Sequence, residues 1–202
     1  MMIVMLCALG VGGATMVGAL VGFVFRRITH RASDIVLSFA AGVSVASAVM
    51  GLILPSLDYG GDLGIIVCIL GIFCGALCVN LLDGAVPFAR KFFGLSGGAE
   101  SERSRRVLVF VMAIAIHNLP EGIAAGVSFG TGNPAEALTV AGGIALQNIH
   151  EGMVLVAPML AAGMSRGRTF VAALMTGLVE VVGTLLGYLA VSVSTAVLPF
   201  AL

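Results

Sequence analysis

Two segments of the chain carry potential metal ligands at the same spacing. His117 and Glu121 are four residues apart, and so are Gln147 and Glu151. Residues at positions i and i+4 project from the same face of a helix, so each pair can approach one ion. Imidazole nitrogen, amide oxygen and carboxylate oxygen form a mixed set suited to Zn²⁺ and other first-row divalent ions. The pattern therefore predicts metal binding that requires no thiolate.

The likeness between the two segments extends beyond these pairs. Residues 115–122 read AIHNLPEG and residues 145–152 read ALQNIHEG, so Ala, Asn, Glu and Gly repeat in register. In neighbouring antiparallel helices, Asn118 and Asn148 can face each other across one interface together with the carboxylates. His150 has two readings at this point, as a further pore-lining group or as a helix-packing histidine.

Three carboxylates, those of Glu121, Glu151 and Glu180, each lie about midway along a long apolar stretch. An ionised carboxylate in the middle of a membrane costs roughly 2.5–3.5 kcal/mol, and such groups face a bundle interior or a watery cavity. These stretches contain no Lys or Arg. The counter-charge must therefore come from solution, and the His and Asn neighbours favour a metal over three protonated carboxyl groups.

Composition requires these residues to be positioned by membrane-spanning helices. Of the 202 residues, 59% are hydrophobic and only 10% are charged, and the mean hydropathy is +1.15. An ordinary soluble domain carries about 25% charged residues. The chain is therefore an integral membrane protein. Its net charge is zero and its basic residues form short clusters, so nothing indicates nucleic-acid binding.

The apolar stretches predict an all-α protein, a bundle of six transmembrane helices forming a single domain over residues 1–202. The expected spans are about 2–24, 35–57, 63–82, 107–130, 135–162 and 169–190. Residues 84–106, rich in Gly, Ser and charge, are expected to form a flexible cytoplasmic loop.

Basic residues predict the orientation of the bundle. All ten Lys and Arg residues follow the first, third or fifth span, and the other two loops contain none. Cytoplasmic loops carry the excess of basic residues, so these three loops are assigned to the cytoplasm and the N-terminus to the outside.

Local sequence signals refine the helices. Asn133-Pro134 followed by Glu136 predicts a helix start with a capping side chain. Pro120 removes one backbone hydrogen bond, so a kink is expected in the fourth span. Small residues every four positions predict a face of the first span suited to close helix packing, and a homodimer is a possible use of that face. These residues are Gly10, Ala14, Gly18 and Gly22.

The paired motifs at 117–122 and 147–152 strongly resemble the fourth and fifth spans of the ZIP (Zrt/Irt-like) divalent metal transporters, especially their bacterial GufA-like branch. Residues 176–180 (TGLVE) are similar to the sixth span of that family. Residues 38–42 (SFAAG) and 54–56 (LPS) are similar to its second span. The resemblance covers essentially the whole chain.

This resemblance implies a binuclear metal site midway through the membrane. On matching positions, the primary transport site would be formed by His117, Glu121, Gln147 and Glu151. A neighbouring site would be formed by Asn118, Asn148 and Glu180, with Glu121 and Glu151 bridging the two. The family carries Zn²⁺, and often Fe²⁺, Mn²⁺ or Cd²⁺, into the cytoplasm, and sliding of one helix group against another is the motion proposed for it. Localisation in the bacterial inner membrane follows by the same analogy.

The chain departs from the family pattern at several positions. His150 stands where Pro is common, and Asn148 where some relatives have Asp. In the second span, Ser44 and Gly51 replace a Met and a Ser, which removes a soft ligand and a hydroxyl. The family has eight spans, and the sequence ends where a seventh would begin. We expect the sequence to be a fragment rather than a shortened protein that relies on a partner chain.

Divalent-metal uptake is the leading functional prediction, with the metal as transported substrate and no cofactor. An inactive or structural metal-binding membrane subunit is the alternative. An intramembrane metallo-hydrolase is less favoured, because His150-Glu151 begins an H-E-x-x-H motif whose second His is replaced by Val154. The chain is therefore not expected to be an enzyme.

Overall fold

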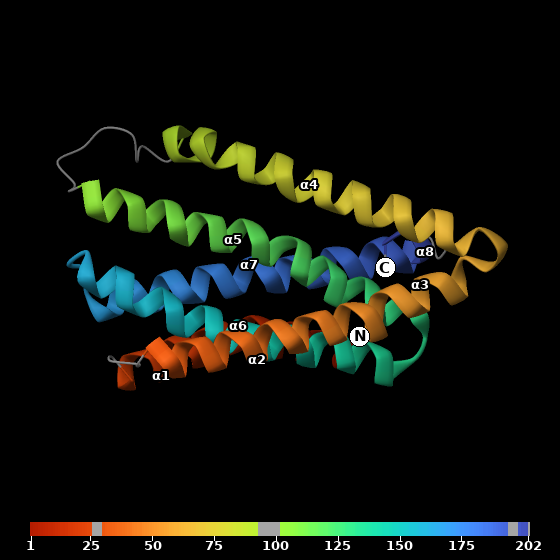
Figure 1. Cartoon of the computed structure of the whole chain (residues 1–202), viewed down its shortest axis with the longest axis horizontal. Helices are drawn as coiled ribbons and strands as arrows, with labels where there is room; N and C mark the ends of the chain where they lie inside the picture. The colour runs from red at the N-terminus through yellow and green to blue at the C-terminus, as the bar shows by residue number, and fades with distance from the viewer. Residues whose placement is uncertain (26–29, 93–101, 194–197, 202) are drawn as a thin grey trace.

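The computed structural model describes residues 1–25, 30–92, 102–193 and 198–201, which are almost entirely helical, with no strand among them. Among these residues, six helices are long and apolar enough to cross a membrane, which confirms the predicted all-α, six-span class. The helices lie side by side in one bundle (Figure 1). Their bounds are α1 Met2–Val24, α2 His30–Ala48, η1 Val49–Ile53, α3 Leu54–Tyr59, η2 Gly61–Leu63, α4 Gly64–Phe92, α5 Glu102–Ser128, η3 Phe129–Thr131, α6 Pro134–Ala161, α7 Arg166–Val193 and α8 Leu198–Ala201.

Four of these helices, α1, α5, α6 and α7, form a closely packed unit. Helix α1 packs along both α6 and α7, and α5 packs along α7. At the crossing of α1 and α7, a Cβ added to Gly12 would collide with the carbonyl oxygen of Gly177, and a Cβ added to Gly177 would collide with that of Gly12. The two backbones therefore touch directly, which is the contact that small residues permit in membranes.

The glycine face of α1 differs in one respect from the prediction. Gly18 and Gly22 pack against α6 as expected, but Gly10 is exposed and has no neighbour within 4 Å of an added Cβ. A step of four residues advances about 40° around a helix of 3.6 residues per turn, so a four-residue stripe drifts off a straight contact. Gly12, and not Gly10, makes the close contact with α7. Because this face is used inside the chain, it gives no support to a homodimer interface.

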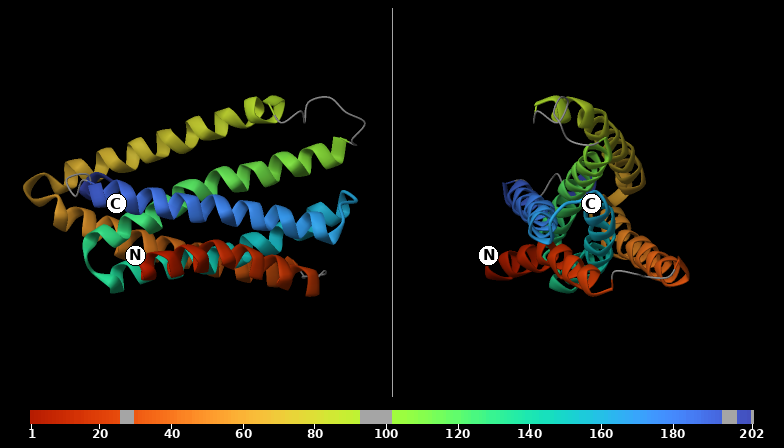
Figure 2. Two further views of the ribbon diagram at one scale, coloured as in Figure 1. Left: turned by 180° about the vertical axis from the view of Figure 1, so that it is seen from behind. Right: turned by 90° about the vertical axis from the view of Figure 1, so that its left-hand side faces the viewer.

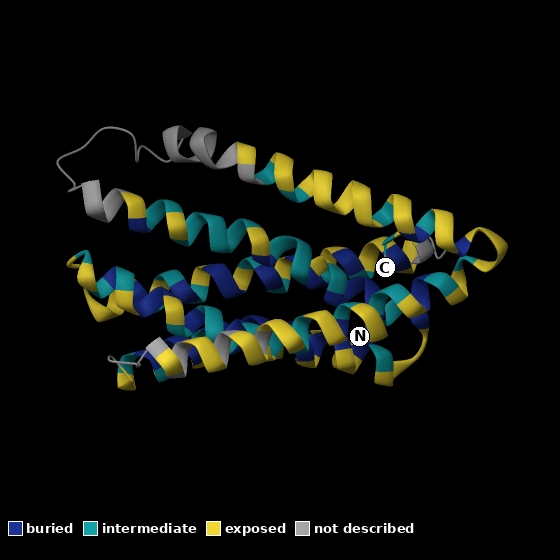
Figure 3. Ribbon diagram, viewed as in Figure 1, coloured by how far each residue is buried: buried dark blue, intermediate teal, exposed yellow. Residues whose placement is uncertain are grey.

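Helices α2 and α4 lie at the periphery of the bundle (Figure 2). Helix α2 packs against α6, whereas the described side chains of α4 are mostly exposed (Figure 3). Large apolar groups such as Ile65 and Phe73 are 68% and 70% exposed. In a protein composed mainly of apolar spans, such a surface is suited to contact with lipid chains.

A local irregularity interrupts the second span, where one continuous helix was predicted. The helix widens into a π turn at Val49–Ile53, immediately before Pro55. Proline has no N–H and its ring presses on the carbonyl four residues earlier, here that of Gly51, so the wider turn accommodates it. Beyond this point, the Tyr59 hydroxyl donates to the backbone carbonyl of Thr131 and ties α3 to the α5–α6 turn.

The expected loop over residues 84–106 is shorter in the structure. Helix α4 continues to Phe92 and α5 begins at Glu102, which leaves only residues 93–101, outside the described residues. Gly, Ser and charge mark where the apolar stretch ends, but a helix can continue past that boundary. Composition therefore located the edge of the span rather than the end of the helix.

The predicted start of the fifth span is present at α6. The Asn133 side-chain oxygen accepts from the Ala135 N–H at 3.1 Å, and its nitrogen donates to Glu136 Oε1 at 2.8 Å. Pro134 occupies the first helical position, where no N–H is needed. Gly132, with φ of +70°, reverses the chain just before this cap.

The direct backbone contact between α1 and α7 yields a stability prediction. Gly12→Ala forces a methyl group into the Gly177 carbonyl, and overpacking of this kind costs about 1–3 kcal/mol. We expect a lower thermal midpoint by circular dichroism for the protein in nanodiscs. Gly10→Ala is the matched control, because an added Cβ there meets nothing, and it should leave the midpoint unchanged or raise it. Equal midpoints for the two variants would contradict the packing described.

Candidate metal centre

The structure describes all seven residues predicted from the sequence to bind metal and places them on three neighbouring helices. They are His117, Asn118 and Glu121 on α5, Gln147, Asn148 and Glu151 on α6, and Glu180 on α7. Three of them are fully buried inside the closely packed unit, namely Asn118, Asn148 and Glu180. Glu121, Gln147 and Glu151 are half-buried, and His117 is exposed one helical turn before Glu121.

Gln147 joins the two half-buried carboxylates. Its side-chain nitrogen donates to Glu121 Oε1 at 2.7 Å and to Glu151 Oε1 at 3.3 Å. Its oxygen accepts a hydrogen bond from the Ser44 hydroxyl of α2. The second carboxylate oxygen of Glu121, Oε2, is buried and has no hydrogen-bond partner among the described residues.

Ser44 was overlooked as a site residue by sequence reasoning, which treated it as the loss of a soft ligand. The hydroxyl instead reaches the amide oxygen of Gln147 across the α2–α6 interface. No sequence signal marked this contact, because a lone Ser in an apolar span is common. The structure therefore adds a residue of α2 to a cluster otherwise built from α5 and α6.

Asn148 organises the fully buried group. Its side-chain nitrogen donates to the carbonyl oxygen of Val11 on α1, at 3.0 Å, and to Glu180 Oε2 on α7. One amide thus connects α6 with two other helices. Asn148 Oδ1 and Glu180 Oε1 are buried without a hydrogen-bond partner in the described part of the chain.

Asn118 belongs to the group that contains Glu121 and Glu151. The amide orientation that satisfies both of its atoms has the nitrogen donating to the Ile114 carbonyl at 2.8 Å and to Glu151 Oε2 at 3.2 Å, in place of a longer contact to the Thr176 carbonyl. The polar residues therefore form two hydrogen-bonded groups, one around Gln147 and the other around Asn148 and Glu180, which together are called the polar network. In each group, amides bond the carboxylates.

Within the described residues, no three His, Cys, Asp or Glu side chains converge closely enough to hold an ion by themselves. Any coordination shell here would therefore also use other donors, such as amide oxygens, hydroxyl oxygens or water. His150, on α6 between Gln147 and Glu151, is half-buried. Its role as a pore-lining group and its role as a helix-packing histidine both stay predictions.

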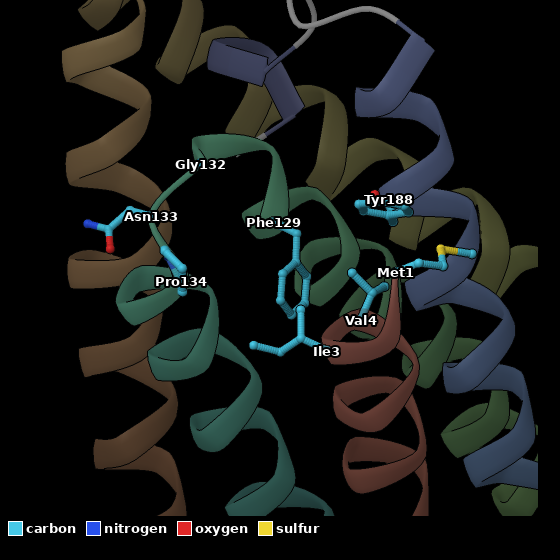
Figure 4. Close-up of a pocket in the computed structure, with 8 residues that line it drawn as sticks. All are labelled: Met1, Ile3, Val4, Phe129, Gly132, Asn133, Pro134 and Tyr188. Atoms are coloured by element: carbon cyan, nitrogen blue, oxygen red, sulfur yellow. The ribbon is translucent and has the colours of Figure 1, made fainter.

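A separate cavity of about 210 Å³ lies at the end of the bundle where α1 begins (Figure 4). It is lined by Met1, Ile3, Val4, Phe129, Gly132, Asn133, Pro134 and Tyr188. This lining includes neither a carboxylate nor an imidazole. The cavity is therefore distinct from the polar network.

A bundle of membrane-crossing helices with an acid-containing polar core defines a multi-pass membrane protein. Comparison with known proteins defines its family. The chain belongs to the ZIP zinc transporter family, whose model matches residues 94–201. This confirms the resemblance drawn from the paired motifs. Because the members of this family are transporters, it also confirms that the chain is not an enzyme.

Three bacterial relatives show the extent of the similarity. Zinc transporter GufA of Myxococcus xanthus is 33% identical over 197 residues, which cover 95% of this chain and 77% of that protein. Zinc transporter ZIPB of Bordetella bronchiseptica is 38% identical over 180 residues, 86% of this chain and 58% of ZIPB. Zinc transporter ZupT of Chlorobium chlorochromatii is 31% identical over 191 residues, 88% of this chain and 71% of that protein. The chain thus spans less than two thirds of ZIPB.

The bridging role of Gln147 yields a prediction for the metal-free protein. Gln147→Ala leaves the facing oxygens of Glu121 and Glu151 without their donor, and an unsatisfied buried polar group costs about 1–3 kcal/mol. We expect a lower thermal midpoint in the presence of a chelator. Thr139→Ala is the control, because it removes one hydrogen bond from an exposed position of the same helix. A midpoint for Gln147→Ala equal to that of the control would show that the bridge adds no stability.

Proposed function

We propose that the protein carries divalent cations, with Zn²⁺ as the main substrate, across a bacterial inner membrane into the cytoplasm. The primary site of this proposal consists of His117, Glu121, Gln147 and Glu151. The second consists of Asn118, Asn148 and Glu180, with the carboxylates of Glu121 and Glu151 shared between the two. The three bacterial relatives are zinc transporters, which supports zinc as the substrate.

The observation that carries the proposal is the bridge made by Gln147. Its amide nitrogen bonds oxygens of both Glu121 and Glu151, which belong to different helices. Two carboxylates that share one donor lie close enough to share an ion after modest side-chain movement. A divalent cation between them would neutralise both negative charges, which no Lys or Arg of the spans can do.

Metal binding at this site requires an exchange of partners. The ion would displace the Gln147 nitrogen from the carboxylates, and rotation of the amide would present its oxygen instead. His117 would supply a nitrogen ligand from one turn away on α5. Carboxylate and imidazole bind metal in their deprotonated forms, so protons leave as the ion arrives.

The second site rests on Asn148 and Glu180. The two side chains are bonded to each other inside the closely packed unit, and each retains an oxygen that has no partner among the described residues. Asn118, the third member proposed for this site, bonds to Glu151, which the proposal shares between the two sites. An ion held here would lie within reach of the shared carboxylates.

The arrangement of basic residues supports the proposed orientation. Helices α2, α5 and α7 all begin at one end of the bundle (Figure 1). Arg31, Arg106, Arg166 and Arg168 lie in the first turns of these helices or at the edge of their spans. We assign this end to the cytoplasm and the N-terminus to the outside.

Zinc flux into proteoliposomes tests the transport assignment. The double variant E121A/E151A should reduce the initial rate by at least about tenfold, read with a Zn²⁺-sensitive dye sealed inside, because both shared carboxylates are gone. Glu136→Ala removes a carboxylate from the same helix outside the network and should keep most of the flux. Unchanged flux in the double variant would overturn the site. Zinc binding without any flux in the unmodified chain would favour the structural subunit.

Transport should also depend on pH. Protons compete with metal for Glu121, Glu151 and His117, so the apparent affinity for Zn²⁺ should fall as the outside pH is lowered from neutral toward acid. The measurement is the KM of zinc uptake across a pH series with the free Zn²⁺ concentration buffered. A KM that stays constant or improves toward acid pH would contradict a carboxylate and imidazole site.

A further inference from the structure

Every helix of the closely packed unit contains a completely buried polar residue. They include Thr15 of α1, Asn118 of α5, Asn148 of α6 and Glu180 of α7, each with 0% exposure. The proposed function uses the last three and leaves Thr15 without a role. A fully buried hydroxyl in an apolar bundle is unfavourable unless it is hydrogen-bonded.

Thr15 differs from the other threonines of the described helices. Its hydroxyl is buried and has no hydrogen-bond partner among the described residues. The others each donate to a backbone carbonyl three or four residues earlier, at 2.8–3.0 Å. They are Thr131, Thr139, Thr169, Thr176 and Thr184. The hydroxyl of Thr15 therefore lacks the bond that its residue type normally makes in a helix.

One carbonyl within reach of a threonine side chain at this position has another partner. It belongs to Val11, four residues earlier, and it accepts the side-chain nitrogen of Asn148 at 3.0 Å. The same nitrogen donates to Glu180 Oε2. The amide of Asn148 therefore lies against the turn of α1 that leads to Thr15 and reaches α7.

The helix directions bring Thr15 and Glu180 toward each other. Side chains on a helix lean toward its N-terminus. Helices α1 and α7 run in opposite directions (Figure 1). Gly177 is packed on Gly12, and Glu180 and Thr15 each lie three residues further along their helices, so by this rule both side chains lean toward the crossing. On α6, Gly152 packs against the backbone carbonyl of Thr15 one turn beyond Asn148.

Three buried oxygens without partners thus belong to residues on the three helices that the Asn148 amide nitrogen and its contacts bring together, α1, α6 and α7. They are Thr15 Oγ1, Asn148 Oδ1 and Glu180 Oε1. One is a hydroxyl, one an amide and one a carboxylate oxygen, and oxygen donors of these kinds bind divalent cations. We infer that Thr15 is an additional ligand of the second ion site, so that α1 supplies an oxygen to the bound cation. This inference rests on the proposed function.

The test uses the full chain in nanodiscs and Zn²⁺ titrations followed by calorimetry. Thr15→Val keeps the shape of the side chain and removes the hydroxyl, and it should weaken one of two Zn²⁺-binding steps by about tenfold while leaving the other unchanged. Thr15→Ser retains a hydroxyl and should restore the affinity. Thr184→Val is the matched control, because Thr184 is equally buried and its hydroxyl donates to the backbone carbonyl of Glu180.

A stability measurement separates a ligand from a packing residue. Without metal, Thr15→Val should match or exceed the thermal midpoint of the unmodified protein, because it removes a buried hydroxyl that has no partner. The rise in thermal midpoint on adding Zn²⁺ should be smaller in Thr15→Val than in the unmodified protein, and Thr15→Ser and Thr184→Val should not show this decrease. A lower midpoint without metal, together with equal weakening of both binding steps, would assign Thr15 a structural role and overturn the inference.

The outcomes for this inference and for the proposed function are distinct. If the unmodified chain binds no Zn²⁺, the proposed function fails and the inference fails with it. If the unmodified chain binds two ions and Thr15→Val binds both with unchanged affinity, only the inference fails. If the unmodified chain binds only one ion, and Glu180→Gln leaves the affinity for that ion unchanged, the second site is absent. The role of Thr15 is then overturned, while the primary site stands.

Discussion

The organisation of this protein depends on how three carboxylates are accommodated inside a membrane-spanning bundle whose fourth to sixth spans contain no Lys or Arg. The structure surrounds Glu121, Glu151 and Glu180 with amides: Gln147 bonds the first two, Asn118 the second and Asn148 the third. Amide dipoles compensate for part of the lost hydration without adding a fixed positive charge. The core is therefore polar and hydrogen-bonded, and its negative groups remain able to attract a cation.

Close helix packing makes this arrangement possible. Where α1 meets α7, the absence of side chains at Gly12 and Gly177 brings carbonyl groups of one helix against the next. Only at such short separation can Asn148 of α6 bond both to the α1 backbone and to a carboxylate of α7. In contrast, α4 keeps most of its described surface exposed. The chain thus combines a compact unit that contains most of the polar network with helices attached more loosely around it.

Much of this structure could be predicted from periodic features of the sequence. Apolar length gave the six spans, the Asn133–Glu136 cap gave the start of α6, and the repeat of Asn and Glu thirty residues apart brought α5 and α6 to one network. Features that depend on contacts between helices were missed. Gly12 rather than Gly10 makes the close contact with α7, a π turn precedes Pro55, and Ser44 donates a hydrogen bond to Gln147. Such details depend on which carbonyl or amide lies opposite, and a single sequence does not record that.

The contact between Ser44 and Gln147 has a thermodynamic consequence for the whole bundle. The Ser44 hydroxyl donates to the Gln147 oxygen, and a hydroxyl can also accept from an amide nitrogen. A change in the orientation of the Gln147 amide therefore changes a hydrogen bond between α2 and α6. By reciprocity, a ligand that alters the free energy of this contact has its own affinity altered by the same factor when the contact forms. A single serine thus couples the docking of α2 to the state of the core.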